Sequence, residues 1–492
     1  MSNEKNKSYI RLGIIAGIIL LALLLGQIFG ALETVTELLT TIGLVLLGIT
    51  ILVTIHELGH FLTAKAFGMR VEAFSIGFPP KLFSFTKGDT EYQIGATPLG
   101  GYVKISGMID ESLDTDHLAK EPEPYEFRAK PVWQRLIVMT GGVIMNVILA
   151  ILIFTGIKYT YPDEKLPVSQ VKYGIEVDPT GNSLGNIIGF ETGDSIISFM
   201  GEKAEYFDDY QSQNRLVTDD AYFEVMRKGK VLRLEVPGNA QNYFNHDSIS
   251  SFLFSPDLPA TLLVVDSLRD PATKKGLTGL PAYEAGLRTG DQIVQIDSQQ
   301  VSLFSDLRKA LVGKFASPVT VEAVRDGDTL SFAFLTDSAG KLGVNPQLER
   351  YFELDTIQYS FSEALAEGPK EAFSVLITNI KGIKNLFRRD VDASKSVMGP
   401  IQIAKVYRQA SQFGGIKGFL SLTAVLSMVL AFVNILPIPA LDGGHVMFLL
   451  IEGITRREPS TKVRIIAQQV GMIFILGLML LIIFNDVFQV AS

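Results

Sequence analysis

The chain has 492 residues, of which 47% are hydrophobic, and its formal net charge is −8. This acidic balance gives no support to nucleic-acid binding, which favours basic surfaces. Because the chain has no cysteine, disulfides and thiolate metal sites are excluded. Any transition-metal site must use His, Asp or Glu, and the five histidines are His56, His60, His117, His246 and His445.

Five long apolar stretches predict a multi-pass α-helical membrane protein. The first, residues 10–31, is long enough as a helix to cross a hydrocarbon core of about 30 Å. It exceeds the usual length of a signal-peptide core, so a retained anchor is favoured over a cleaved signal peptide. The other four stretches are residues 38–67, 132–159, 416–440 and 464–487.

Positive charge predicts how these segments are oriented. Lysine and arginine are frequent in the amino-terminal tail, in residues 68–131 and in the short loop before the last segment. Such residues favour the cytoplasmic side, so one orientation fits every short loop and places residues 160–360 outside. We therefore expect a protein of the cytoplasmic membrane, with the lipid bilayer as a partner and no nucleic acid.

The region expected outside contains an internal repeat. The segments Gly189–Ile197 and Gly286–Val294 share the pattern G-φ-x-x-G-D, in which φ is an apolar residue. Short alternating runs around each copy, such as residues 319–324, are typical of strands. The pattern predicts two α+β modules, at residues 166–255 and 260–347. They either bind peptides by adding a strand to a sheet edge or act as spacers and size filters.

Residues 68–107 do not have the pattern of a helix. Residues 71–77 and 91–95 alternate like strands, and the pairs Pro79-Pro80 and Gly100-Gly101 interrupt them. Exposed backbone is costly in lipid, so a hairpin here must lie against helices or line a wet cavity. A free strand edge at this place offers a binding site for an unwound substrate.

The strongest local signal is His56-Glu57-Leu58-Gly59-His60, inside the second apolar stretch. Residues four apart share one face of a helix, so His56 and His60 can bind one zinc ion. Glu57 is then placed to take a proton from the water that the metal activates. Ionisable side chains within an apolar helix are costly, which makes a functional site the default interpretation.

A catalytic zinc needs a third protein ligand, and Asp442 is the candidate. An apolar helix, residues 419–433, runs into Pro437 and Pro439 and then into an Asp-Gly-Gly turn. A carboxylate at membrane depth needs a partner, and a metal cation provides one. Asp442 completes a His-His-Asp set that leaves a coordination position for water. His445 would join the set only if the chain bent sharply after Asp442.

These motifs together resemble the site-2 protease family, in its bacterial regulator-of-sigma-E protease branch. The resemblance rests on H-E-x-x-H, on N-x-x-P-x-P-x-L-D-G at residues 434–443 and on residues 74–81, 98–104 and 127–135. The G-φ-x-x-G-D repeats resemble PDZ domains. The sequence departs from the usual family pattern at Pro79-Pro80, at residues 140–146 and in its extra first segment.

The resemblance, which covers residue 38 to the end, implies roles for five residues. His56, His60 and Asp442 bind zinc, Glu57 is the catalytic acid and base, and Asn434 helps to hold the substrate. It also implies that the hairpin near residues 70–105 contacts the substrate.

The expected fold is a multi-pass α-helical membrane protein with a site-2 protease core, a membrane-embedded β-hairpin and two inserted α+β PDZ-like domains. Residues 361–389 have helical apolar spacing and form either an amphipathic helix on the outer membrane surface or a helix packed on a module. The expected domains are residues 1–37 (extra transmembrane segment), 38–160 (first half of the core), 166–255 and 260–347 (PDZ-like), 361–389 (amphipathic helix) and 416–492 (second half of the core).

The expected function is intramembrane proteolysis by metal-assisted hydrolysis, with Zn²⁺ as the cofactor. The substrates implied are transmembrane proteins such as anti-sigma factors, together with remnant signal peptides. An inactive scaffold is a rival, but it would have no need of an intact H-E-x-x-H and Asp442. A zinc transporter is a second rival, but the sequence has no repeat of its membrane segments.

Overall fold

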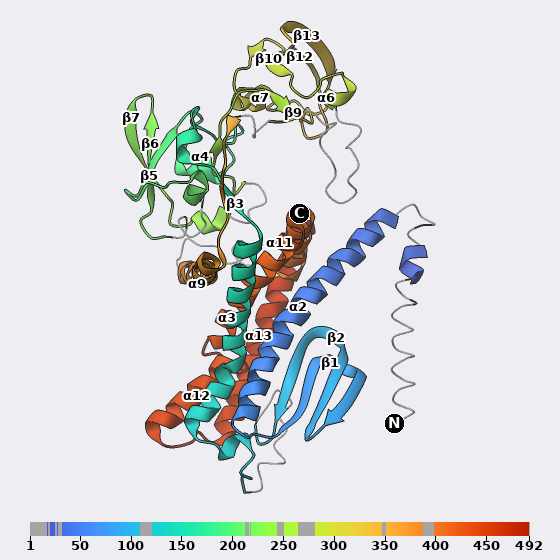
Figure 1. Ribbon diagram of the computed structural model, residues 1–492, viewed down its shortest axis with the longest axis vertical. Helices are drawn as coiled ribbons and strands as arrows, with labels where there is room; N and C mark the ends of the chain where they lie inside the picture. The colour runs from blue at the N-terminus through green and yellow to red at the C-terminus, as the bar shows by residue number, and fades with distance from the viewer. Residues whose placement is uncertain are drawn as a thin grey trace. The chain divides into compact units, whose positions relative to one another are not determined.

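The computed structural model describes residues 32–108, 121–211, 218–243, 250–263, 281–346, 351–386 and 398–491, and positions 17, 20–24, 27 and 216. Most of the expected first segment, and both His117 and His246, lie outside these residues. The chain forms two compact units (Figure 1). Unit 1 comprises Met1–Tyr161, Ser360–Leu376 and Met398–Ser492, and unit 2 comprises Pro162–Tyr359 and Ile377–Val397.

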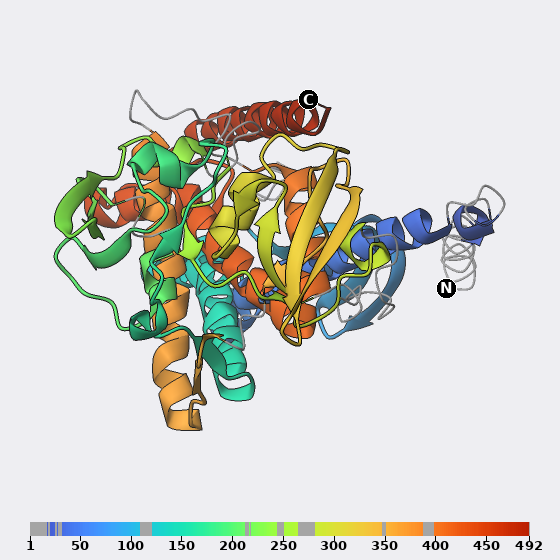
Figure 2. The same cartoon turned by 90° about the horizontal axis from the view of Figure 1, so that it is seen from above.

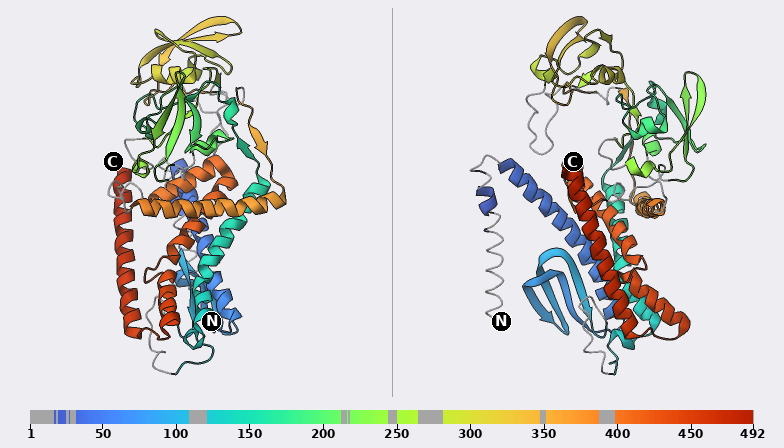
Figure 3. Two further views of the ribbon diagram at one scale, coloured as in Figure 1. Left: turned by 90° about the vertical axis from the view of Figure 1, so that its left-hand side faces the viewer. Right: turned by 180° about the vertical axis from the view of Figure 1, so that it is seen from behind.

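Long helices form most of unit 1 (Figures 1 and 3): α2 (Leu32–Ala66), α3 (Val132–Thr160), α11 (Pro400–Ile435), α12 (Asp442–Thr455) and α13 (Thr461–Ala491). In the described part of the chain, four segments are long and apolar enough to cross a membrane. They are Val35–Ala66, Val132–Thr160, Gly414–Ile435 and Thr461–Phe488. Long apolar helices thus lie at the last four predicted spans, and the third of them ends at Ile435, before the predicted residue 440.

The segment around Asp442 corrects one expectation. Asp442-Gly443-Gly444 is not a turn in a loop but the first turn of α12, whose 14 residues are too few to cross a bilayer. A Cβ at Gly443 would overlap the carbonyl oxygen of Leu436. The glycine therefore lets α12 start directly against the proline-containing loop that ends α11, which fixes the position of Asp442.

Helices α2 and α3 cross with their backbones in contact. A Cβ at Gly59 in α2 would overlap the carbonyl oxygen of Gly141 in α3. Small residues allow this close approach, as is usual between membrane helices. The hydroxyl of Ser427 in α11 donates to the backbone oxygen of Asn146 in α3 at 2.7 Å. These contacts bring α3 against the C-terminal part of α2 on one side and against α11 on the other.

The predicted strands form β1 (Val71–Lys87) and β2 (Thr90–Ile105), beside α2 in Figure 1. Residues 73–76 pair with residues 101–104 on one side and with residues 91–94 on the other. The end of β1, residues 83–87, pairs with residues 90–94. Residues 101–105 therefore form an edge of the sheet, and among the described residues no further strand pairs with them.

Unit 2 contains two α+β modules, each with its own apolar core. The first has the sheet order β5-β6-β7, and the second has the order β11-β10-β12-β13. In the second, the long strands β12 and β13 run antiparallel (Figure 2). The first contains β4 (Ile175–Glu176), α4 (Leu184–Ile188), β5 (Ser195–Phe199), η4 (Phe207–Gln211), β6 (Tyr222–Arg227), β7 (Lys230–Glu235) and β8 (Ser255–Pro256). The second contains β9 (Leu262–Leu263), α6 (Pro281–Glu284), β10 (Gln292–Ile296), β11 (Gln299–Gln300), α7 (Phe304–Ala310), β12 (Pro318–Arg325), β13 (Asp328–Leu335) and β14 (Asn345–Pro346).

The two copies of the sequence repeat fold in the same way. The second glycine of each motif has a positive φ, 93° in the first copy and 95° in the second, a conformation that favours glycine. The following Asp194 and Asp291 are buried and accept two hydrogen bonds at 2.7 Å from Arg227 and Arg325 respectively. Each arginine follows its aspartate by more than 30 residues, so the motif did not reveal it.

The ends of unit 2 are paired with each other, because β3 (Asp163–Lys165) and β15 (Asp355–Ile357) form an antiparallel ladder. Beyond β15, α9 (Phe361–Leu386) is the predicted amphipathic helix, and residues 387–389 lie outside the described residues. Ala372 in the first half of α9 packs in a core cluster with Phe154 of α3 and Met428 of α11. Phe361 and Leu365 lie on its exposed face.

Candidate metal centre and active site

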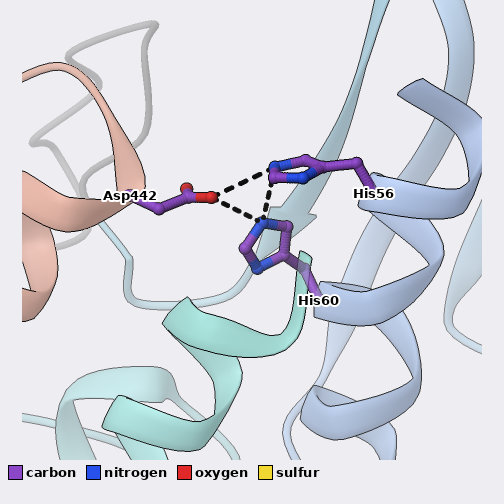
Figure 4. A group of neighbouring side chains, drawn as sticks. All are labelled: His56, His60 and Asp442. Atoms are coloured by element: carbon purple, nitrogen blue, oxygen red, sulfur yellow. Dashed lines mark hydrogen bonds and ion pairs between the residues drawn. The ribbon is translucent and has the colours of Figure 1, made fainter. Parts of the chain in front are cut away.

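The structure brings His56, His60 and Asp442 together at one buried point (Figure 4). Both histidines project from the same face of α2, and their Nε2 atoms are 3.3 Å apart. Asp442 approaches from the first turn of α12. Its Oδ2 atom lies 3.1 Å from His56 Nε2 and 3.4 Å from His60 Nε2.

This donor set fits a zinc ion. Zinc bonds of about 2.0–2.1 Å in a tetrahedral arrangement give ligand–ligand edges of about 3.3 Å, close to the three distances observed. The Oδ2 atom of Asp442 is buried and has no hydrogen-bond partner within the described structure. A carboxylate oxygen and two imidazole nitrogens that converge in this way need a cation between them.

Each histidine ring also has a polar neighbour at its Nδ1 atom. His60 Nδ1 lies 2.8 Å from the carbonyl oxygen of Val138, an acceptor, so Nδ1 carries the proton and the Nε2 lone pair faces the cluster. His56 Nδ1 lies 3.2 Å from Nδ2 of the fully buried Asn146. A Cβ at Gly142 would lie 2.6 Å from both His60 Nε2 and His56 Cε1, so glycine leaves the space that the two rings occupy.

Glu57 lies next to the cluster without joining it. It lines a cavity of about 620 Å³ together with the three cluster residues and residues 100–105 of β2. A Cβ at Gly101 would lie 3.3 Å from Glu57 Cγ, so the glycine-containing edge strand runs close beside this carboxylate. The cavity holds enough space for water molecules beside the Glu57 carboxylate, a group that can accept a proton.

Asn434 and His445 border the same cavity. Nδ2 of Asn434, at the end of α11, lies 3.3 Å from His56 Nε2. His445 follows Asp442 by one helical turn, and in the described part of the chain it does not belong to the group that converges on one point. The five residues to which the sequence assigned a role all border this cavity: His56, Glu57, His60, Asn434 and Asp442.

Sequence reasoning missed two residues of α3 that contact the histidines, Asn146 and Gly142. A polar side chain in an apolar helix, four residues after a glycine pair, is a signal that would have found them. The segment 140–146 was noted as a departure from the family pattern and was not connected with the metal.

Comparisons with known proteins place the sequence in a family. The sequence model of peptidase family M50 matches residues 44–478. A protein of Vibrio cholerae named "Putative zinc metalloprotease" is 28% identical over 475 residues, which cover 92% of this chain and 99% of that relative. The regulator of sigma-E protease RseP of Escherichia coli strain K12 is 28% identical over 454 residues, covering 89% and 96%. The corresponding protease of Salmonella typhimurium strain 14028s is 29% identical over 465 residues, covering 90% and 97%.

The match extends over most of the chain and includes both the helix with the two histidines and the helix that begins at Asp442. The chain belongs to peptidase family M50, and it is a multi-pass membrane protein and a zinc metallopeptidase.

Proposed function

We propose that this zinc metallopeptidase hydrolyses peptide bonds within the membrane-spanning segments of other proteins. The observation that carries the proposal is the position of the cluster. His56 and His60 lie on the apolar span Val35–Ala66, beside a cavity that an edge strand lines. A soluble substrate would not need a site built on such a helix.

In this proposal His56, His60 and Asp442 are the zinc ligands. A bound zinc ion supplies Lewis-acid activation of water and of the scissile carbonyl. Glu57 takes the proton of the attacking water and delivers it to the leaving nitrogen of the substrate. Its place in the cavity, outside the converging group, supports the role of proton carrier.

The substrate is proposed to bind as an unwound strand. Residues 101–105 form an edge of the sheet along the cavity, and strand addition would hold a peptide there by backbone hydrogen bonds. The amide of Asn434, 3.3 Å from His56 Nε2, borders the position where the reacting carbonyl must bind. We therefore assign Asn434 to substrate binding.

The proposed substrates are single-span proteins such as anti-sigma factors, and remnant signal peptides are a further class. Support comes from relatives that are named regulators of sigma-E. The proposed location is the cytoplasmic membrane, with unit 2 on the extracytoplasmic side, in line with the lysine and arginine distribution. Tags at Glu121 and Pro459 should then be reachable only from the cytoplasm, and a tag at Asn239 only from outside.

The proposed activity is tested with purified protein in detergent and a single-span model substrate. Removal of zinc with a chelator should abolish cleavage within the membrane segment, and zinc should restore it. Mass spectrometry of the products locates the cut. Cleavage that continues in metal-free protein, or that falls only outside the apolar segment, contradicts the proposal.

We further propose that residues 166–255 and 260–347 are PDZ-like modules that exclude substrates with bulky outer domains. They are inserted in the chain between α3 and the later helices, and the three residues of the cluster, His56, His60 and Asp442, all lie outside them. Helix α9 (Phe361–Leu386), with its exposed apolar face, is proposed to lie on the outer membrane surface.

The filter is tested by deletion. Lys165 and Asp355 are paired in register, so a short flexible linker can replace the residues between them. The shortened enzyme should keep its zinc and cut untrimmed substrates that the parent cuts only after trimming. A zinc-loaded deletion variant that still rejects the untrimmed form rules out the filter, and slower cleavage of trimmed substrates indicates delivery by strand addition.

A further inference from the structure

Asn146 is a buried polar residue that the roles assigned so far do not include. It lies on α3, its side chain is fully buried, and its amide is 3.2 Å from His56 Nδ1. With Nδ2 directed at the ring, the Oδ1 atom has no hydrogen-bond partner in the described structure. A buried unpaired amide oxygen beside a histidine ring needs a physical explanation.

The protonation state of a metal-binding histidine supplies that explanation. If His56 Nε2 gives its lone pair to zinc, the proton of the neutral ring must reside on Nδ1, which then donates a hydrogen bond. Nδ2 of an amide cannot accept that bond, whereas Oδ1 can. Rotation of the amide by half a turn places Oδ1 against Nδ1–H, and amide orientation is assigned from such networks.

We propose that Asn146 is a positioning residue that accepts a hydrogen bond from His56 Nδ1 and holds Nε2 toward the metal. The proposal rests on the metal site proposed above. It gives the two histidines equivalent support, because His60 Nδ1 already donates to the carbonyl oxygen of Val138. The acceptor for His60 is a backbone carbonyl, whereas the proposed acceptor for His56 is the side chain of Asn146. Mutation of Asn146 can therefore test the proposed hydrogen bond to His56.

The backbone of Asn146 is held in place by contacts with a neighbouring helix. Ser427 of α11 donates to the backbone oxygen of Asn146 at 2.7 Å and is itself fully buried. Gly142, one turn earlier on α3, leaves room for both rings. The amide therefore meets His56 from a backbone that is fixed between two helices.

The test is a zinc titration of the full-length protein in detergent, with a chromophoric chelator as competitor. Asn146→Leu removes the acceptor at similar volume and should weaken zinc binding about 10- to 100-fold, the usual effect of losing such a contact. Asn146→Asp keeps an acceptor oxygen and should restore binding. The absorption spectrum of the cobalt-substituted protein should change in the leucine variant and return toward the parent's in the aspartate variant.

Two variants in the same titration separate the possible failures. Ser427→Ala breaks the hydrogen bond to the backbone of Asn146 but keeps the side-chain acceptor, so it should lower zinc affinity much less than Asn146→Leu does. A loss as large as that of Asn146→Leu would attribute the effect to packing and overturn the proposal. His56→Ala should lose zinc. If it does not, the metal site itself fails.

If His56→Ala loses zinc while Asn146→Leu binds like the parent, or if the aspartate variant is as weak as the leucine variant, the positioning role alone is overturned. Should the leucine variant fail to fold, Asn146→Ala removes the same acceptor with less bulk and carries the same expectations.

Discussion

Units 1 and 2 both bury carboxylates, but the partners of those carboxylates differ. In unit 2, Asp194 and Asp291 each receive two hydrogen bonds from an arginine of the same module. The arginines neutralise the buried charge, and the pKa of Arg227 is raised chiefly by its hydrogen bonds to Asp194. In unit 1, the charge of Asp442 faces two imidazole rings, and its inner oxygen has no hydrogen-bond donor among the described residues.

The difference shows how a structural carboxylate can be told from a ligand. Deep burial does not identify a metal ligand, because Asp194 and Asp291 are more deeply buried than Asp442. The partner of the carboxylate identifies it. An arginine neutralises the charge of a buried carboxylate, whereas a carboxylate that faces only the lone pairs of imidazole nitrogens needs a bound cation.

Glu57→Gln should have the largest effect. The amide cannot carry a proton between water and the leaving group, so cleavage should fall by at least about 10²- to 10⁴-fold. Zinc content should stay at the parent level, because Glu57 is outside the converging group. Initial rates on the single-span substrate, with metal analysis of the same sample, provide the measurement. Turnover close to the parent's would remove Glu57 from its proposed role.

Arg227→Met should affect unit 2 without affecting the metal. The change leaves Asp194 buried and uncompensated, which typically costs about 3–5 kcal/mol. Hydrogen exchange of the amides in β5 and β6 measures the local free energy of opening. Zinc affinity should be unchanged, and a loss of zinc would break the distinction between the two kinds of carboxylate.

Arg233→Met is the matched control for that change. Arg233 pairs with Glu235 on the same module, but both side chains are more than half exposed. Exposed ion pairs contribute little to stability because water screens them, so the exchange rates should scarcely move. Equal effects of the two arginine variants would indicate that the modules respond to general charge and not to the buried pair.

The smallest expected effect concerns Asp257, a buried carboxylate with neutral donors. It accepts hydrogen bonds from the hydroxyl of Ser305 at 2.5 Å and from the backbone of Leu258. Burial raises the pKa of Asp257 above its ordinary value of 3.8, and the nearby Glu176 adds to this rise. The folded chain thus holds the proton to higher pH than the unfolded chain does.

Asp257 therefore stabilises unit 2 most in acid, and this contribution decreases as the pH rises from about 3.8 through the raised pKa. Asp257→Asn should remove that decrease and gain stability relative to the parent at neutral pH. Hydrogen exchange at several pH values compares the two proteins. A stability difference that does not vary with pH would contradict the sign of the pKa shift.

The sequence predicted those parts of the structure that local patterns encode. The spacing of His56 and His60 follows from one turn of a helix, and the apolar runs follow from bilayer thickness. Asp442 could be predicted because a carboxylate at membrane depth needs a partner, and a metal bound by two histidines needs a third ligand. The strands near residues 71–95 were recognised by alternation and by their glycine and proline breaks.

What the sequence did not predict depends on contacts between distant segments. The start of α12 at Asp442 depends on how closely Gly443 approaches the preceding loop. The spacing of apolar residues in the sequence contains no information on this approach. The arginine partners lie 33 and 34 residues from their aspartates. The acceptor for His60 is the backbone carbonyl of Val138. Every residue type has this carbonyl, so the identity of residue 138 does not predict the contact.

The most direct test of the central claim is the zinc content of Asp442→Ala. Parent and variant are equilibrated in the same zinc-buffered detergent solution, and bound metal is measured together with hydrogen exchange of α2 and α3. The account predicts a single zinc ion in the parent, a large loss in Asp442→Ala and unchanged exchange in the helices. A folded Asp442→Ala protein that keeps the parent's zinc at limiting free metal would show that Asp442 is not a ligand and would contradict the account.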